Sequence, residues 1–449
     1  MKQDKFTYAQ ITSTFLEFEN GNQLLDLKLK DVYIWEVCRT DIFFMLVDHF
    51  ISGNVAIEKK SKWVLIKNTL YRIFVNSLFF NPLYDRKEKK VLIFESGRKY
   101  GNQDSQIDIY TNYLDQQLKE KNISFTRYET NYNTDAPFFK RNFEVKHLDY
   151  IQLLSKLRSE KMTPFNLEEQ NKITEIKQGI YDCFGIDLAL ETIFESNIAK
   201  FKKEFSLFKI LFKNKKCKEI FVVNSCDKPA LIAAAKEQNC IVNELQHGLN
   251  SDQDIVLNFP LTKVGSLHYF PDYFHQWNNV EMFFAKLPIA KENVKYFENE
   301  NIAYWLEKTK SLKKIPNTIL VISQPYGSTE IFQFMKNNST EMPNYSFIYK
   351  VHPVENFEIF SDFLSNNPTI KNIRFVQNEE SLYELMKKST LVLGIYSSAL
   401  FEAVAFDCKV ILLNLPGVEM SLSLLSNQRN KIINVGDKLS DLVIQNNHK

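Results

Sequence analysis

The N-terminal part of the chain, residues 1–88, is predicted to form a helical extension. Its apolar side chains recur at three- and four-residue intervals, as at Val32, Trp35, Phe43 and Leu46. That spacing places them on one face of a helix. Because the intervening positions are largely polar or charged, this face should pack against the rest of the protein.

Lysine, arginine and aromatic residues are interspersed between residues 59 and 90. A basic helix of this kind can lie on an anionic membrane surface. A helix that packs on the domain and exposes a solvated basic face is the more ordinary interpretation of the same pattern. The sequence therefore leaves peripheral membrane association open as an alternative.

From residue 89 the pattern changes to short apolar runs that alternate with helical stretches. Short apolar runs that end in polar residues are typical of buried parallel strands. We predict such strands at 91–96, 124–128, 219–225 and 240–248. The alternation predicts a Rossmann-like domain over residues 89–305. Within it, residues 140–215 are predicted to be mostly helical, and a polar helical linker is predicted over 280–314.

A second series of strands and helices begins at residue 317. Apolar runs at 318–323, 347–351, 373–377 and 391–397 alternate with helical segments, and a further run follows at 408–414. We predict a second Rossmann-like domain over residues 306–449. Two such domains facing each other across a cleft, with a helical N-terminal extension, make an α/β protein of the GT-B class.

Composition narrows the function classes. The chain has 449 residues, of which 44 % are hydrophobic, and its net charge is +2. This balance gives no basic excess of the kind that nucleic-acid binding requires. No apolar run approaches the ~18 residues that span a bilayer, and the N-terminus lacks the apolar core of a signal peptide. Six separated cysteines without a zinc-ligand spacing fit a reducing compartment, so we expect a cytoplasmic protein.

In the second half, candidate chemistry lies where predicted strands end, because ligands of open α/β sheets bind at the carboxyl ends of the strands. One strand ends in Lys350, His352 and Pro353, and the proline disfavours helix at the histidine. Another strand ends at Ser397 and Ser398, where a helix starts and its free N–H groups favour an anion. Glu402, one turn further, is positioned to accept hydrogen bonds from ribose hydroxyls. A strand-capping histidine and a helix-capping serine remain the simpler alternatives.

Two further strand ends carry polar groups. The first strand of the second half leads into Gln324, Tyr326 and Gly327, a glycine-containing turn that lets backbone approach a ligand. In the first half, a strand leads into a polar set that should face the cleft, since burying such groups without a task is costly. That set consists of Glu244, Gln246, His247 and Gly248.

Some nucleotide and metal sites are excluded by the sequence. Asp252 and Asp254 match a D-x-D pattern, but they follow a polar loop and not a strand. The chain has no G-x-x-x-x-G-K-[ST] motif and no G-x-G-x-x-G motif, so the usual phosphate loops are missing. We therefore expect no metal and no bound cofactor.

Taken in order, three motifs resemble bacterial capsule and surface-polysaccharide glycosyltransferases of the GT-B type. They are E-x-Q-H-G at 244–248, K-x-H-P at 350–353 and Y-S-S-A-x-x-E-A at 396–403. The resemblance is to CMP-sialic acid, polysialic acid and CMP-Kdo transferases. It implies that His352, Ser397 and Ser398 bind the phosphate of a CMP-sugar donor. The same motifs also resemble those of CDP-glycerol and CDP-ribitol phosphotransferases.

The resemblance implies an inverting, metal-independent transfer that needs a general base. Those families hold an acidic base in the N-terminal half, and Glu95-Ser96-Gly97 is only a partial copy of that motif. We favour Glu95 as the base, followed by Asp108 and Asp104, with His247 as the rival.

The expected partners are a CMP-sugar donor and an oligosaccharide or glycolipid acceptor, without nucleic acid. The expected location is the cytoplasm, with peripheral association at the inner face of a bacterial membrane as the alternative. A non-catalytic scaffold of capsule assembly, anchored by the basic N-terminal helices, is a further alternative for the function.

Overall fold

The computed structural model describes most of the chain, in ten segments. They are residues 6–51, 70, 72–100, 107–129, 145–157, 163–248, 251–277, 285–325, 327–353 and 355–444. Asp104, Tyr326 and residues 52–69 of the basic segment lie outside the described residues. None of the helices within the described segments is long and apolar enough to cross a membrane.

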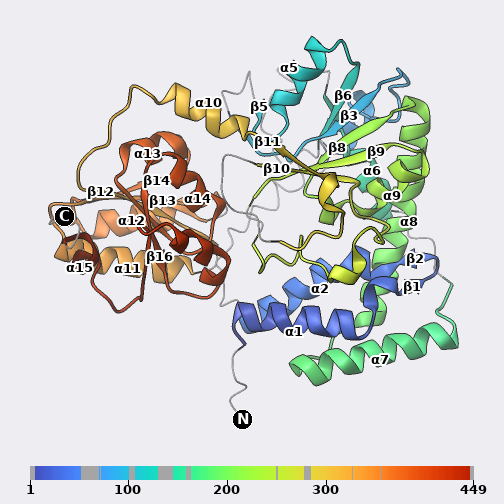
Figure 1. Cartoon of the computed structure of the whole chain (residues 1–449), viewed down its shortest axis with the longest axis horizontal. Helices are drawn as coiled ribbons and strands as arrows, with labels where there is room; N and C mark the ends of the chain where they lie inside the picture. Colours follow the sequence, from blue (N-terminus) through green and yellow to red (C-terminus); the bar gives the residue numbers. More distant parts are fainter. Residues whose placement is uncertain are drawn as a thin grey trace.

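The N-terminal helices pack on the first Rossmann-like domain (Figure 1). Helix α1 (Tyr8–Gly21) and helix α2 (Ile34–Phe50) share one apolar core with α7 (Leu167–Phe184) and α8 (Leu190–Lys215). The predicted helices are thus present, with a turn η1 (Leu24–Asp26) and a short antiparallel pair, β1 (Lys28–Leu29) and β2 (Val32–Tyr33), between them. Inside this core the carboxylate of Glu19 accepts from Arg39 Nε at 2.7 Å.

The first sheet has seven strands, all parallel, in the order β11-β10-β9-β8-β3-β6-β7. In chain order this is 3-2-1-4-5-6 with a seventh strand at one edge, the doubly wound Rossmann arrangement. The strands are β3 (Val91–Phe94), β6 (Phe125–Glu129), β7 (Val145–His147), β8 (Glu219–Val223), β9 (Ile241–Leu245), β10 (Tyr273–Trp277) and β11 (Val294–Phe297).

Helices cover both faces of this sheet. α8 and α9 pack beside each other, and α6 packs on α8; apolar side chains of β3, β8 and β9 meet those of α8 and α9 in one core. On the other face, α5 packs its leucines against β3, β8 and β9. These helices are α5 (Asn112–Glu120), α6 (Asp149–Leu157) and α9 (Pro229–Glu237), and the short segments nearby are η2 (Arg72–Asn76), α4 (Ser77–Phe79), the pair β4 (Lys99–Tyr100) and β5 (Ile107–Asp108), and η4 (Ser225–Asp227).

The second sheet has six parallel strands in the order β14-β13-β12-β15-β16-β17. This again reads 3-2-1-4-5-6 in chain order. The strands are β12 (Thr318–Ile322), β13 (Ser346–Lys350), β14 (Ile373–Val376), β15 (Leu391–Gly394), β16 (Lys409–Leu413) and β17 (Lys431–Ile433). The helices around it are α10 (Glu300–Lys308), α11 (Ser328–Glu341), α12 (Phe357–Asn366), α13 (Leu382–Lys388), α14 (Ser398–Ala405), η7 (Val418–Ser426) and α15 (Leu439–Ile444).

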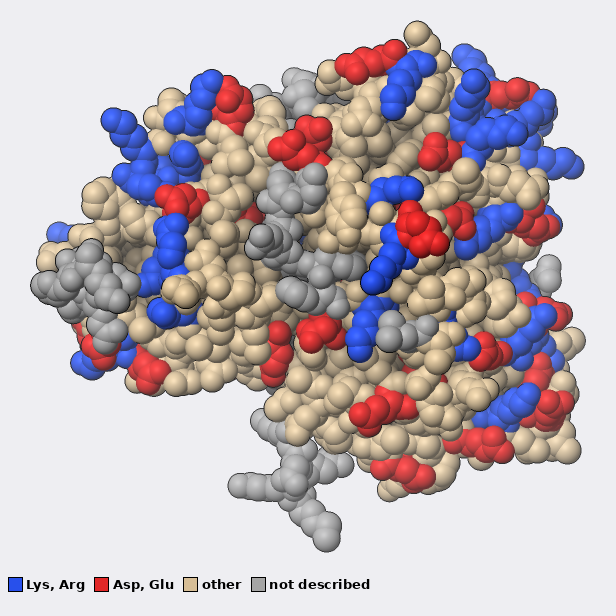
Figure 2. Space-filling view, viewed as in Figure 1, with Lys and Arg blue, Asp and Glu red and all other residues tan. Residues whose placement is uncertain are grey.

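The predicted fold class is confirmed, because the chain forms two doubly wound parallel sheets, the GT-B arrangement. They lie side by side in Figure 1, with the second sheet and its helices in orange and red. Figure 2 shows lysine and arginine interspersed with acidic residues on the viewed face, in keeping with the small net charge.

Two expectations need correction. Among its described residues, the segment predicted as a polar helical linker over 280–314 contains the strand β11, a short 3-10 turn, η6 (Lys291–Asn293), and one α-helix, α10. β11 is an edge strand, and Lys295 and Tyr296 in it are exposed, so its polar composition resembles that of a surface helix. In addition, two of the six cysteines are not separate thiols. Cys217 and Cys240, which precede β8 and β9, form a disulfide with their Cα atoms 6.2 Å apart.

Candidate functional site

A pocket of about 430 Å³ opens where the strand order of the first sheet reverses, between the ends of β3 and β8. Open α/β sheets bind ligands at such a switch point, because the loops leave the two strands toward opposite faces. The lining side chains come from the strand ends, from α6 and from α8. Among them are Glu95, Ser96, Arg98, Tyr110, Gln152, Ser155, Lys156, Lys200, Glu204, Asn224, Asp227, Lys228 and His247.

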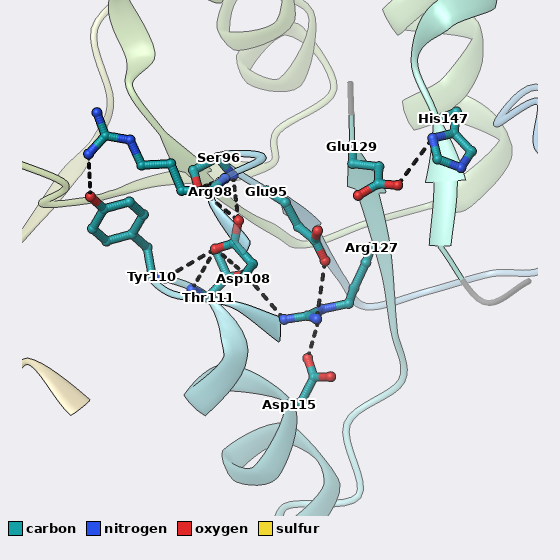
Figure 3. A network of polar contacts seen from close by, with 10 residues as sticks. All are labelled: Glu95, Ser96, Arg98, Asp108, Tyr110, Thr111, Asp115, Arg127, Glu129 and His147. Atoms are coloured by element: carbon teal, nitrogen blue, oxygen red, sulfur yellow. Dashed lines mark hydrogen bonds and ion pairs between the residues drawn. The ribbon is translucent and has the colours of Figure 1, made fainter. Parts of the chain in front are cut away.

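Asp108 organises the loop that follows β3 (Figure 3). Its Oδ2 accepts from the amide and the hydroxyl of Ser96 at 3.0 and 2.7 Å. Its Oδ1 accepts from the amides of Tyr110 and Thr111 and from the Thr111 hydroxyl. The residue is fully buried. Since both oxygens are occupied in this way, the geometry favours a structural role for Asp108 and not the role of a base.

Glu95 lies in the pocket wall beside a cation (Figure 3). Its Oε1 is 3.1 Å from an Nη atom of Arg127, and its side chain is 1 % exposed. Arg127 also contacts Asp115 at 3.0 Å. A carboxylate that is ion-paired in this way is a weak proton acceptor, because the neighbouring charge stabilises its ionised form. Glu95 is therefore better suited to a structural role in the pocket wall than to the role of a general base.

The charge of Arg98 acts on groups of both domains, and the sequence motifs gave no indication of this residue. The residue follows β3, and its Nη1 donates to the Tyr110 hydroxyl at 3.1 Å. Its charge acts on His247 in its own domain and on His352 and Glu402 in the other. Three groups from β9, β13 and α14 thus lie within electrostatic range of one guanidinium.

Of the polar residues that end β9, His247 lines the pocket. Burial and then the charges of Arg98 and Lys228 lower the pKa of His247 to about 3, so the imidazole is neutral. Its ring meets that of Tyr110 edge to face, with the centroids 6.3 Å apart. His247 is therefore a neutral polar group at the point where both domains approach.

The neighbours of His247 are engaged within the fold. Glu244 is fully buried and accepts from the amide and hydroxyl of Ser225 at 3.0 and 2.6 Å. Burial raises the pKa of Glu244 to about 7. Gln246 accepts from the Trp277 amide at 2.8 Å and donates to the carbonyl of Gly248 at 3.0 Å. These contacts hold β9 in its surroundings, and His247 is the member of the motif that lines the pocket.

His352 lies at the end of β13, as the sequence indicated. Its amide donates to Glu355 Oε2 at 2.8 Å, and the side chain is half-buried. Burial and then Arg98 lower the pKa of His352, whereas burial raises the pKa of Glu355. Pro353 follows and is exposed. The side chain of Lys350 is engaged elsewhere. Its Nζ donates to the carbonyls of Gln377 and Glu380 and so supports the loop that follows β14.

The ends of β12 and β15 meet at the switch point of the second sheet. Gln324 is buried, and its Oε1 accepts from the Tyr396 amide at 2.8 Å. Ser397 caps α14 and accepts from the Ala399 amide at 3.2 Å, and Ser398 is the first residue of the helix. Gln324 thereby fixes the backbone that leads into both serines.

Glu402 and Gly327 complete this edge. Burial raises the pKa of Glu402, which hydrogen-bonds to Tyr383, and the charge of Arg98 opposes that rise. Asn301 donates to the Tyr383 hydroxyl at 2.6 Å. Gly327 has a φ of +78°, and a Cβ there would lie 2.7 Å from Ile395 Cδ1. The turn after β12 thus requires glycine for its own packing.

The described residues show no group of three metal-ligating side chains. Asp254 Oδ1 accepts from the Val256 amide at 3.0 Å within a turn, and Asp252 is exposed. The D-x-D pattern therefore forms part of a loop, and the candidate site is made of residues at the two switch points, including Arg98.

Neither a scan of protein-family models nor a search of curated proteins finds a match for this sequence. Solved structures with a similar fold include UDP-GlcNAc 2-epimerase from Neisseria meningitidis bound to UDP-GlcNAc. It is 13 % identical over 80 % of this chain and 89 % of its own, with a TM-score of 0.44. UDP-GlcNAc 2-epimerase from Methanocaldococcus jannaschii is 14 % identical over 81 % and 93 %, with a TM-score of 0.46. Acinetobacter baumannii MurG is 11 % identical over 80 % and 89 %, with a TM-score of 0.47. Such distant likenesses say nothing of the donor or the reaction of this chain.

Proposed function

We propose that this protein is a metal-independent, inverting glycosyltransferase that transfers a sialic acid- or Kdo-like sugar from CMP to a surface-glycan acceptor. The observation that carries the proposal is the position of Arg98. This residue of the first switch point lies within electrostatic range of His352 and Glu402, which belong to the second domain. Two nucleotide-fold domains with facing switch points suit a reaction between two bound substrates.

The second domain would hold the donor phosphate. Ser397 and Ser398 stand at the N-terminus of α14, where free amides and the helix dipole favour an anion. His352 at the neighbouring strand end adds a neutral donor, and Arg98 adds a full positive charge from across the cleft. Negative charge grows on the phosphate as CMP leaves, so donors fixed around it lower the barrier.

The first domain would hold the acceptor and its base. We assign the base to His247, because Glu95 is paired with Arg127 and Asp108 is occupied on both oxygens. A bound phosphate anion near His247 would raise the pKa of the imidazole from its low value toward the working range. In the transfer the acceptor oxygen bonds to the sugar carbon, and its proton moves to the imidazole. The bond between carbon and phosphate oxygen breaks, and CMP leaves with the electron pair.

The choice of CMP rests on the ordered motifs around His352 and Ser397, and a thermal-shift screen tests it. A nucleotide that binds the folded state raises the unfolding temperature, and at equal concentration the tighter ligand raises it more. We expect CMP to stabilise the protein more than CDP, UDP or GDP do at equal concentration. A larger shift with UDP or GDP would refute the cytidine assignment.

A transfer assay then separates the reaction types. CMP-sialic acid, CMP-Kdo and CDP-glycerol are incubated with the protein and a glycan acceptor, and released CMP is measured. We expect CMP release from a CMP-sugar and a product without phosphate. A product that retains phosphate would instead identify a polyol-phosphate transferase, and binding of no nucleotide would identify a scaffold.

A further inference from the structure

Among the described residues, those that line the pocket at the first switch point all belong to the first domain. They come from the ends of β3, β8 and β9 and from neighbouring helices, chiefly α6 and α8. A volume of about 430 Å³ lies within the usual range for small-ligand sites. The pocket is therefore available to a molecule other than the one bound at Ser397 and Ser398.

The carboxylates of this pocket already have partners. Glu95 pairs with Arg127 at 3.1 Å, and Asp227 pairs with Lys228. Glu204 Oε1 accepts from the Ser155 hydroxyl at 3.2 Å but has no cation at ion-pair distance among the described residues. Only Glu204 thus adds an unbalanced negative charge to the pocket.

The cations of the pocket divide into two kinds. Lys228 donates to the carbonyls of Val223 and Asn224 and to Asp227, which uses all three of its N–H groups. In contrast, Lys156 and Lys200 line the pocket without a hydrogen bond or ion pair to any part of the chain that the structure describes.

The charges of this pocket therefore do not balance. Besides the two lysines, Arg98 has the Tyr110 hydroxyl as its hydrogen-bond partner and no carboxylate at ion-pair distance within the described segments. These three positive charges, less the one of Glu204, leave a surplus of two.

The charges of the two free lysines act on the same carboxyl. Burial raises the pKa of Glu204, and the charges of Lys200 and Lys156 oppose that rise. Both ammonium groups are therefore near the same carboxyl, although one comes from α8 and the other from α6. A concave site with a surplus of one sign concentrates ligands of the opposite sign.

We propose that this pocket binds an acidic sugar of the acceptor, whose carboxylate or phosphate is held by Lys156 and Lys200. Arg98 supplies the third positive charge, and the oxygens of Glu204 and Ser155 supply acceptors for sugar hydroxyls. The inference rests on the proposed function only in calling the ligand an acceptor. The binding of the acidic sugar itself requires no donor nucleotide.

Direct binding to the full chain tests the inference without any reaction. Calorimetry or ligand-observed NMR compares methyl glucuronide and glucose 6-phosphate with neutral methyl glucoside. Charge-assisted hydrogen bonds are stronger than neutral ones, and we expect about a tenfold preference for one acidic sugar. Whichever of the two acidic sugars binds more tightly shows whether the pocket prefers a carboxylate or a phosphate. Equal affinity for all three sugars would overturn the inference.

The double variant Lys156→Met and Lys200→Met should lose this preference, while Lys202→Met, on the solvent side of the same helix α8, should keep it. An unchanged preference in the double variant would also overturn the inference. CMP thermal shifts on the same proteins separate the two proposals. Acidic-sugar binding without a CMP shift would refute the proposed function alone, and a CMP shift without acidic-sugar preference would refute the pocket alone.

Discussion

The two sheet edges that face each other carry different kinds of polar group. At the first edge, charges contact one another, as Glu95 does with Arg127, and Arg98 retains a free charge. At the second edge, neutral groups such as His352 and Ser397 dominate, and burial raises the pKa of the carboxyl of Glu402. One edge thus supplies charge and the other supplies directed hydrogen bonds.

The two edges would therefore contribute in different ways to the binding of a phosphate. At the second edge, neutral hydrogen-bond donors in fixed positions and a helix N-terminus would hold a phosphate in one orientation. Arg98 of the first domain adds a charge that acts on both His352 and Glu402 of the second. Each of the following predictions tests one side of this comparison.

The largest effect is expected for Arg98→Met. Arg98 is the one first-domain charge within the described segments that acts on both His352 and Glu402. Its loss should lower kcat/KM by about 10³, the upper range for one charge-stabilising group. Steady-state transfer assays measure this. The matched control is Arg429→Met, a surface arginine paired with Asp407, which should retain full activity. Activity within threefold of wild type in Arg98→Met would refute the bridging role.

The second side of the comparison is probed by His352→Ala. Removal of one directed donor to the developing phosphate charge should lower kcat by about 10². His49→Ala, an exposed histidine of α2, serves as the control. Near wild-type turnover by a folded His352→Ala protein would remove His352 from the donor site.

Glu244→Gln tests the buried charge of the first edge through stability. The pKa of Glu244 is raised to about 7, so its protonated form stabilises the folded state, and this contribution is lost as pH rises from 4.5 through 7. Glutamine keeps an acceptor for the Ser225 amide. Relative to the variant, wild type should therefore lose roughly 2 kcal/mol between pH 5 and pH 8. Denaturant titrations at both pH values measure this, and parallel curves for the two proteins would contradict it.

The smallest effect is expected for Gly327→Ala. A side chain at φ +78° is strained, and its Cβ would collide with Ile395, so the unfolding free energy should fall by about 1 kcal/mol. Gly436→Ala is the control, since no atom lies within 4 Å of its added Cβ. If both variants unfold at the same denaturant concentration, the turn after β12 does not depend on glycine.

The sequence predicted the fold well because both sheets are buried on two faces. Fully buried parallel strands give continuous apolar runs, such as those of β12 and β15, which periodicity detects directly. Edge strands do not, and β11 was missed because half of its side chains are polar and exposed. Pairing of Cys217 with Cys240 was also missed, since only the sheet register brings residues 23 positions apart together.

The site was predictable only in part, for a similar reason. Strand ends identified His247, His352 and Ser397, because parallel strands deliver their carboxyl ends to one edge. The contacts of individual side chains could not be inferred from the sequence. Asp108 was predicted as a candidate base and Lys350 as a donor-binding residue, and in the structure both make hydrogen bonds within the fold. Arg98 was missed because its importance comes from the other domain and not from its neighbours in sequence.

The buried pair of Glu19 and Arg39 has a consequence for shortened versions of the protein. Arg39 also donates to the carbonyls of Ile255 and Asn258, in the loop that follows β9 and the candidate site. Deleting α1 would leave the guanidinium of Arg39 in an apolar interior without its carboxylate partner. This should lower the free energy of unfolding by about 3–5 kcal/mol and weaken the packing of that loop. Helix α1 thus supports, from a distance, the loop next to the candidate site, and a shortened protein that lacks this helix should be less stable.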